Sequence, residues 1–435
     1  MMQRIISQAQ KLEKLMRAPL LNSAFWCGVG SIATNGVNIL SQIIAARIIG
    51  KEAYGQLVLL QSTTSTIGIF AGLGIGITAT RYVAALKDSS PERLINILTL
   101  AEIALLVIGV FLTLIIGFQH DFIAVNILKS PGISSPLFIS AFAIPIISID
   151  NYKKSILIGL SKYRDFAYSS LLGCIPSIPI IAILAIKFGI LGVAISMLVS
   201  AIIQLSISSL FCKKSIKYRA PFRFIKKSLQ EWKVLRDFAL PALLSSVLVT
   251  PTHWVCQTLL VHFDSNSYSD VATLGIAMQW FNIAIFLPNI IGRALLPILV
   301  KDKASRNFKA SLLINILSAL SVSLPIATLS SIVMSWYGRD FSNSTPLEIS
   351  SFTAVIYAIS IPVAQALAAQ EKMWIGFIMN LGWAIAYISV SFLMVHHGAT
   401  GIMFAMAIAY IMHVFWSLFA YNMLKKRTAK LAHYY

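Results

Sequence analysis

The sequence predicts an all-α polytopic membrane protein, with twelve transmembrane helices in two pseudo-twofold related six-helix bundles around a central cavity. Three observations predict this fold class. Hydrophobic residues make up 57% of the 435 residues and charged residues only 12%, which is too apolar for a water-soluble fold. Twelve windows of about 20 mostly apolar residues, the length that crosses a bilayer, follow one another along the chain. Polar and glycine patterns of the first half also return in the second half.

The twelve windows are separated by short polar segments. One of these, in the stretch AARIIGKEAYGQ, interrupts long apolar sequence and is predicted to be the tight turn of the first transmembrane hairpin. The segment before the first window is expected to form an interfacial amphipathic helix, because it lacks the uninterrupted apolar core of a signal peptide. The predicted spans are residues 23–48, 54–80, 94–117, 136–158, 166–187, 189–212, 237–262, 270–298, 308–335, 348–369, 373–395 and 400–424.

Basic residues are distributed unevenly between the two sides of the membrane. If the N-terminus is cytoplasmic, 30 of the 35 lysines and arginines lie on the inner side. This bias predicts that both termini are cytoplasmic. The same bias explains the net charge of +19, so nucleic-acid binding is not needed to account for it. Apart from this bias, the sequence contains no patch of basic and aromatic residues of the kind that binds nucleic acid. The five basic residues at or near the outer side are Arg47, Lys51, Lys129, Lys187 and Arg339.

Several patterns of the first half recur at near-equal offsets in the second half. The polar positions of residues 31–42 return at 246–257, SKYRDF (161–166) corresponds to EKMWIG (371–376), and Gly189-x-x-Gly192 returns as Gly398-x-x-Gly401. Because each half holds an even number of spans, the repeat is parallel, with its axis along the membrane normal. The predicted domains are an N-terminal six-helix bundle at 1–212, a basic cytoplasmic connector at 213–236 and a C-terminal six-helix bundle at 237–435.

Polar side chains within the spans predict which helix faces look away from lipid, because the hydrocarbon layer contains no water. In the first, seventh and eighth spans they recur at steps of three, four or seven residues, which keeps them on one face. We expect these faces to line a cavity between the halves, and interhelical hydrogen bonding is the alternative for each residue. The predicted cavity stripe comprises Asn35, Asn38, Gln42, Thr250, His253, Gln257, Gln279, Asn282 and Asn289.

Charged residues at membrane depth are few. Arg293 lies about 10 Å from the inner end of its span at 1.5 Å per residue, where a cation costs about 2.5 to 3.5 kcal/mol, so it is expected to face protein or water. Asp150 precedes Lys153 and Lys154 at helical spacing, so a local ion pair is one interpretation. Even with this ion pair, the charged residues at membrane depth carry a net positive charge. They therefore predict an inward-opening basic cavity that would bind an anionic headgroup such as a pyrophosphate. Its predicted cations are Arg293, Arg81, Lys153 and Lys154, set against Glu102 and Asp150.

No catalytic signature accompanies these residues in the sequence. The chain has no G-x-S-x-G elbow, Walker loop, H-E-x-x-H motif or acidic metal cluster, and no extramembrane segment is long enough for a catalytic domain. The four cysteines show no C-x-x-C spacing, so neither a disulfide nor a metal site is indicated. The sequence therefore predicts a protein that is not an enzyme and that needs no metal or cofactor.

The run AARIIGKEAYGQLVLLQSTTSTIGIFAGLGIGITATRYVA, Ala45 to Ala84, resembles the first hairpin of the polysaccharide (O-antigen) flippases of Wzx type. These belong to the MOP/MATE-like superfamily, with MATE drug exporters and lipid II flippases. The segments LIGLSKYRDFAYSSLL and FGILGVAISMLVS are similar to the family's fourth, fifth and sixth spans. The resemblance implies alternating access that moves an oligosaccharide on undecaprenyl pyrophosphate from the cytoplasmic to the periplasmic leaflet of the bacterial inner membrane. It also implies membrane lipids, a polysaccharide polymerase and a chain-length regulator as partners.

Ion-driven exchange is expected from the superfamily, although the carboxylate that many drug exporters carry in the first span is absent. Coupling through Glu102 or Asp150 is therefore a hypothesis. Three other functions stay open. A MATE-like multidrug or cation antiporter would have a more apolar or acidic cavity, and a lipid II flippase usually carries two further spans. A membrane-embedded polysaccharide polymerase or ligase usually has a larger periplasmic loop than the roughly 18-residue segment at 118–135.

Overall fold

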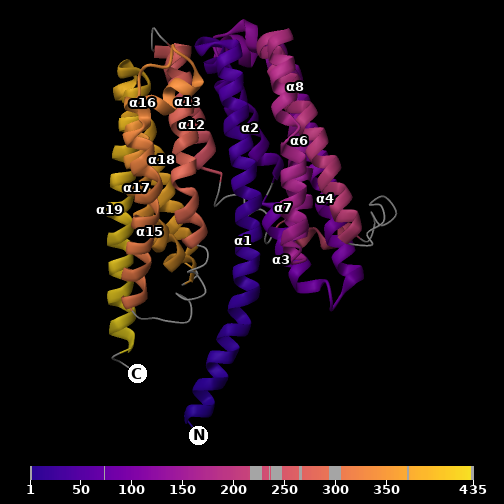
Figure 1. The fold of residues 1–435 in the computed structure, drawn as a ribbon, viewed down its shortest axis with the longest axis vertical. Helices are drawn as coiled ribbons and strands as arrows, with labels where there is room; N and C mark the ends of the chain where they lie inside the picture. The colour runs from indigo at the N-terminus through magenta and orange to yellow at the C-terminus, as the bar shows by residue number, and fades with distance from the viewer. Residues whose placement is uncertain are drawn as a thin grey trace. The chain divides into compact units, whose positions relative to one another are not determined.

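The computed structural model of the protein is built from helices throughout the part of the chain that it describes (Figure 1). The described backbone comprises residues 2–72, 74–215, 228–234, 236, 247–263, 267–292, 305–369 and 372–432. Side chains are described over the same ranges, apart from those of residues 2–25, 305–307, 368–369, 373 and 424–432.

Two compact units make up the chain, and each combines segments that are distant in sequence. Unit 1 comprises Met1–Ile44, Ile67–His120 and Ser135–Leu243. Unit 2 comprises Ala45–Thr66, Asp121–Ser134 and Leu244–Tyr435. The turn of the first hairpin thus packs in the same unit as the second half of the sequence. The division into bundles at 1–212 and 237–435 stays a prediction.

Unit 1 is formed by long apolar helices and by a short segment of the connector. Residues Ser228 and Val234 of that segment are buried, and the Arg93 side chain forms an ion pair with Glu231 at 2.9 Å. The helices of unit 1 are α1 (Met2–Ile49, up to Ile44), α3 (Ile75–Leu86), α4 (Pro91–Phe122), α5 (Ser134–Ala141), α6 (Ala143–Gly159), α7 (Tyr163–Cys174), α8 (Ser177–Ser215), η4 (Leu229–Glu231) and α10 (Trp232–Val234).

Unit 2 contains the end of α1, the start of α2 (Lys51–Gly72) and most of the second half of the chain. A buried contact ties the loop after α4 to this unit, since the Tyr268 hydroxyl donates a hydrogen bond to the Leu128 carbonyl. The other helices of unit 2 are η1 (Ile123–Ile127), η2 (Pro131–Ile133), α12 (Val249–Phe263), α13 (Ser267–Ala284), α15 (Ser305–Thr328), α16 (Ser330–Tyr337), α17 (Thr345–Ala369), α18 (Met373–Met394), η6 (Val395–His397) and α19 (Gly398–Ala432).

The helices account for the twelve predicted spans. Within the described residues, eight helices are long and apolar enough to cross a membrane, or nine if the bent pair of α5 and α6 is one span. The segments Tyr163–Ser215 and Trp374–Met423 each contain two predicted spans. The seventh predicted span lies partly outside the described residues, and α12 is its described part. The described helices thus follow one another in the order of the twelve predicted spans, which confirms this expectation.

The fourth predicted span is bent by 40° between α5 and α6. Pro145 has no backbone N–H, so the Ala141 carbonyl loses its helical partner. The Thr113 hydroxyl of α4 donates a hydrogen bond to that carbonyl at 2.9 Å. Gly109, one turn away on α4, lies so close that an added Cβ would approach Pro145 to 2.8 Å. The bend is stable in lipid because a neighbouring helix supplies the missing donor.

The sequence repeat is confirmed at two equivalent turns. Gly189 has φ 56° and ψ −134°, and its counterpart Gly398 has φ 60° and ψ −145°, a backbone region that is essentially restricted to glycine. The backbone N–H groups of Lys162 and Lys372 each donate to the carbonyl five residues earlier, at 2.9 Å in both cases. The offsets of 209 and 210 residues seen in the sequence therefore correspond to matching local backbone structure.

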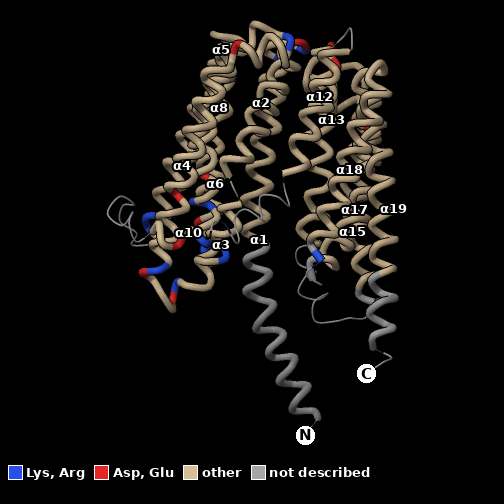
Figure 2. The backbone as a smooth tube through the Cα atoms, turned by 180° about the vertical axis from the view of Figure 1, so that it is seen from behind, with Lys and Arg blue, Asp and Glu red and all other residues tan. Residues whose placement is uncertain are grey.

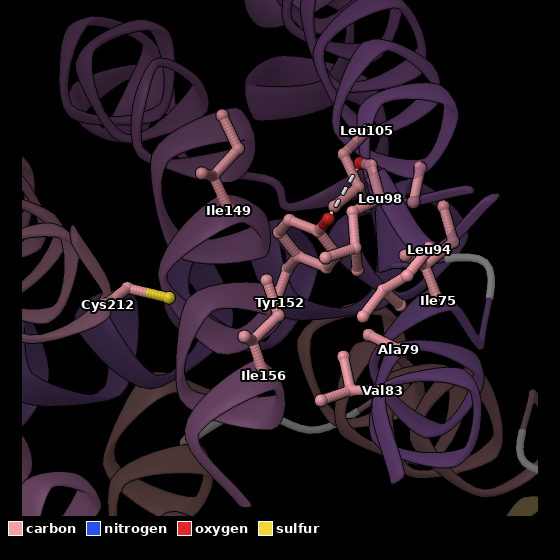
Figure 3. Close-up of a cluster of buried hydrophobic side chains, with 11 residues drawn as sticks. Ile75, Ala79, Val83, Leu94, Leu98, Leu105, Ile149, Tyr152, Ile156 and Cys212 are labelled. Carbon is pink, nitrogen blue, oxygen red and sulfur yellow. Dashed lines mark hydrogen bonds between the residues drawn. The ribbon is translucent and has the colours of Figure 1, made fainter. Parts of the chain in front are cut away.

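The described core of unit 1 lies between α3, α4 and α6 (Figure 3). Ile75, Leu98 and Ile156 are among its buried aliphatic side chains, and Tyr152 inserts its ring among them. The Tyr152 hydroxyl donates a hydrogen bond to the Leu98 carbonyl at 2.7 Å. Lipid tails are as apolar as these side chains, so close packing and this hydrogen bond hold the three helices together.

Candidate functional site

Four charged side chains of unit 1 form two ion pairs at membrane depth. Lys153 of α6 lies 2.8 Å from the Glu102 carboxylate of α4, and their side chains are 13% and 14% exposed. Lys154 lies 2.7 Å from the Asp150 carboxylate one turn earlier on α6. The local ion pair predicted on this helix is confirmed for Lys154. Lys153 pairs across to the neighbouring helix instead.

Each pair leaves hydrogen-bonding capacity unused. Glu102 Oε2 and Asp150 Oδ1 are buried and have no hydrogen-bond partner within the described residues. Lys154 Nζ donates a further hydrogen bond to the Gln204 side chain of α8 at 3.4 Å. Buried ion pairs need such extra hydrogen bonds because both charges have lost their water. Two lysines and two carboxylates cancel, so these four residues contribute no net charge toward a phosphate.

The two predicted arginines of the cavity are placed differently. Arg81 lies on α3 in unit 1, and its side chain is exposed. Arg293 lies outside the described residues. In Figure 2 the lysines, arginines and carboxylates of unit 1 gather around α3, α4, α6 and α10, near one end of its helices. The role of both arginines as cavity cations stays a prediction.

The stripe on α1 is exposed at two of its three positions. Asn35 and Asn38 are exposed, and Gln42 is buried with 9% of its surface accessible. The adjoining face of α1 packs on α7, where a Cβ on Gly30 would lie 3.0 Å from Ala167. Amides exposed at membrane depth are costly against lipid. Ile32 and Leu40 of the same part of α1 are also exposed, so the role of Asn35 and Asn38 in a cavity stays a prediction.

In the seventh span the stripe is enclosed by aromatic side chains of unit 2. The His253 ring lies 5.6 Å from Trp383 and 5.4 Å from Tyr387 of α18, centroid to centroid. Gln257, one turn further along α12, is 6% exposed, and Thr250 is half-buried. His253 is thus surrounded by aromatic rings, and its Nδ1 is buried without a hydrogen-bond partner within the described residues. Its place in the cavity stripe stays a prediction.

In the eighth span the stripe divides into a bonded and an exposed part. The Tyr337 hydroxyl donates to the Gln279 side-chain oxygen at 2.9 Å and accepts a hydrogen bond from the Trp280 indole at 3.1 Å. Asn282 is exposed and Asn289 is half-buried. Gln279 therefore serves helix packing in this structure, and Asn282 is the described member of this stripe most accessible to a ligand.

Sequence reasoning missed the residues that surround these groups. Gln204, Trp383, Tyr387 and Tyr337 carry no periodic pattern, and each meets its polar partner from a different helix. The sequence around each of them shows only the hydrophobicity of an ordinary transmembrane helix. Only the packing of one helix on another brings them to the polar groups.

Comparison with known proteins identifies the chain. Residues 20–303 match the family described as polysaccharide biosynthesis protein. The chain belongs to this family. Two curated relatives of the chain are the EPS I polysaccharide export inner membrane proteins EpsE of Ralstonia solanacearum and Ralstonia nicotianae. They are 23% and 21% identical over 406 and 403 residues, with 89% of this chain and 90% of each relative covered.

Two solved structures show that the chain has a known fold. An inward-facing multidrug resistance MATE family transporter of the MOP superfamily aligns with a TM-score of 0.76, 16% identity, and coverage of 91% of this chain and 96% of the transporter. The lipid II flippase MurJ in an inward closed conformation aligns with a TM-score of 0.72, 17% identity, and coverage of 91% and 87%. The protein therefore has the twelve-helix MOP fold, and at these identities the similarity concerns the fold alone.

Proposed function

We propose that the protein is a flippase that moves an undecaprenyl-pyrophosphate-linked oligosaccharide, an O-antigen or related repeat unit, from the cytoplasmic to the periplasmic leaflet. Alternating access between the two halves provides the movement, and the bacterial inner membrane is the site of action. Membership of the polysaccharide biosynthesis family is the observation that carries the proposal. The names of the relatives, which describe polysaccharide export, and the fold shared with a lipid II flippase support it.

The diphosphate of the substrate requires cations that are not already neutralised. Lys153 and Lys154 are each held by a carboxylate within 3 Å. Their pairs contribute no net charge, so among the predicted cavity cations we assign the main role in diphosphate binding to Arg293. Guanidinium groups suit this role because they form bidentate hydrogen bonds to phosphate oxygens.

The polar stripes are assigned to the sugar. Asn35, Asn38 and Asn282 are exposed on helices that cross the membrane, and their amides both donate and accept hydrogen bonds. Coupling to an ion is assigned to Glu102 or Asp150, because protonation of either carboxylate would release the lysine paired with it. A periplasmic polymerase and a chain-length regulator would act on the product.

A transfer assay in liposomes tests the proposal. Purified protein is reconstituted with undecaprenyl-pyrophosphate oligosaccharide in the inner leaflet, and an external glycosidase reports how quickly the lipid reaches the outer leaflet. Arg293→Ala and Arg293→Glu are compared with Lys187→Ala, which removes a cation at the outer end of a predicted span. We expect the wild type and Lys187→Ala to transfer the lipid equally, and both Arg293 variants to lose most of the activity.

Two results would contradict the proposal at different levels. Transfer by folded wild-type protein no faster than in protein-free vesicles, under imposed proton and sodium gradients, would reject the flippase function and favour a drug exporter of the same fold. Normal transfer by both Arg293 variants would leave the flippase function intact and reject the role of this cation.

A further inference from the structure

A cavity of about 370 Å³ lies in unit 2, between the turn joining α1 to α2 and the segment that follows α16. Arg47, Lys51 and Arg339 line it, together with one carboxylate, Asp340. A neighbouring hollow shares Lys51 and Asp340 and adds the Glu52 carboxylate. The lining of the first cavity therefore carries a formal charge of plus two.

If both termini are cytoplasmic, as the sequence predicts, this cavity lies on the outer side of the membrane. In that predicted orientation, only five of the 35 basic residues lie at or near the outer side, and three of these five line the cavity. The positive-inside bias places basic residues on the inner side, so it does not explain a cluster of three cations on the outer side. The concentration of charge in one place requires another reason.

The three cations keep their charge without a carboxylate partner. Arg47 Nε donates to the Trp336 carbonyl at 2.6 Å, and a second guanidinium nitrogen donates to the Ser335 carbonyl at 3.5 Å. Lys51 Nζ lies 5.7 Å from the centre of the Phe341 ring. Within the described residues, neither these two cations nor Arg339 forms an ion pair. Their charge is thus available to a ligand.

Three of the residues that line the cavity, Ala46, Tyr337 and Phe341, are buried. The ring of Tyr337 lies 6.2 Å from that of Tyr54 on α2, and these two side chains are 0% and 2% exposed. The start of α2 packs closely on α13: a Cβ added at Gly55 would lie only 1.9 Å from the Tyr268 carbonyl oxygen. These contacts fix the start of α2, which carries Lys51.

We infer that this cavity binds the phosphate group of a lipid at the outer leaflet. Resting on the proposed function, we assign that group to the diphosphate of the glycolipid after its translocation. Three cations around one pocket match the charge of a diphosphate better than that of a sugar or an apolar tail. Asp340 opposes the ligand, so binding would be weak enough to allow release. The headgroup of an anionic phospholipid offers the same chemistry, and the experiment separates the two sources.

Protection of an introduced cysteine tests this site by itself. Ser335 lines the cavity and is exposed, whereas the native cysteines are buried or partly buried within predicted spans. Ser335→Cys, in vesicles of phosphatidylcholine with the outer side accessible, is treated with a charged thiosulfonate reagent. Undecaprenyl pyrophosphate, undecaprenol or phosphatidylglycerol is added at increasing concentration. Asn126→Cys, an exposed position of unit 2 that does not line the cavity, is the control for nonspecific protection.

We expect undecaprenyl pyrophosphate to slow the modification of Ser335→Cys several-fold and to leave Asn126→Cys unchanged. Undecaprenol, which lacks phosphate, should have no effect. Adding Lys51→Ala and Arg339→Ala should raise the concentration needed for protection by about tenfold, since the charges of the half-buried Lys51 and the exposed Arg339 are partly screened. Adding Lys129→Ala and Lys187→Ala removes the same charge from the outer side outside the cavity, and should change nothing.

Each other outcome overturns a defined part of the inference. Absence of protection, or equal protection after Lys51→Ala and Arg339→Ala, would reject the phosphate site. Equal protection by phosphatidylglycerol would reject the diphosphate assignment and make the site one for phospholipid headgroups. If the cysteine is not protected but the liposome assay shows normal transfer, the phosphate site is rejected and the proposed function is retained. Protection of the cysteine without any transfer would reject the proposed function, and with it the assignment to a translocated lipid.

Discussion

Removing one partner of the Lys153–Glu102 pair should destabilise the protein far more than removing both. The two side chains are 13% and 14% exposed and 2.8 Å apart, so either charge alone would be left buried without its counterion. Breaking a buried pair costs about 3 to 5 kcal/mol, whereas replacing both members by apolar residues is often neutral. We therefore expect Lys153→Met to lower the free energy of unfolding by about 3 kcal/mol or more, and Lys153→Met with Glu102→Leu to lower it by about 1 kcal/mol at most.

The measurement is equilibrium unfolding in mixed detergent micelles titrated with sodium dodecyl sulfate. Arg93→Ala is the matched control, because its ion pair with Glu231 is 54% and 21% exposed and should contribute less than about 1 kcal/mol. Two findings would refute the reasoning. One is a Lys153→Met variant no less stable than Arg93→Ala, and the other is a double variant whose loss equals the sum of the two single losses.

The remaining predictions concern local structure and use the same unfolding measurement. Thr113→Val should cost about 1 to 3 kcal/mol, because the Ala141 carbonyl would lose the donor that replaces its helical partner; an unchanged stability would mean that water fills this role. Gly189→Ala should cost about 1 to 3 kcal/mol for its backbone conformation alone, since open space surrounds it. Gly398→Ala should cost more, because its Cβ would also lie 2.6 Å from the Asp270 carboxylate, and equal losses at the two glycines would contradict this.

Much of the fold could be predicted from the sequence because the features that determine it are properties of single segments of the chain. The length of apolar runs and the placement of lysine and arginine predict spans and orientation without knowledge of contacts. The repeat was visible for the same reason, and the matching backbone angles of Gly189 and Gly398 confirm it locally. What the sequence did not predict is the bend at Pro145, since whether a proline breaks a span depends on a donor from another helix.

The candidate site was predictable in its residue types and only partly in its pairings. The spacing of Asp150 and Lys154 predicted an ion pair, which the structure contains, because one helical turn separates the two residues. The partner of Lys153 was not predictable, because Glu102 lies 51 positions earlier on another helix. The stripe residues His253 and Gln279 were read as cavity-facing, and tertiary packing surrounds them with Trp383, Tyr387 and Tyr337.

The sequence by itself determined that this is a twelve-span membrane protein with a parallel internal repeat, because hydrophobic length and charge bias act on each segment independently of the others. Only the tertiary structure decided which charges are neutralised and which remain available. It pairs Lys153 with Glu102, and it brings Arg47 and Lys51 together with Arg339, nearly 300 residues further along the chain. The physical reason is that electrostatic interactions fall off with distance in space, and helix packing, not sequence separation, sets that distance.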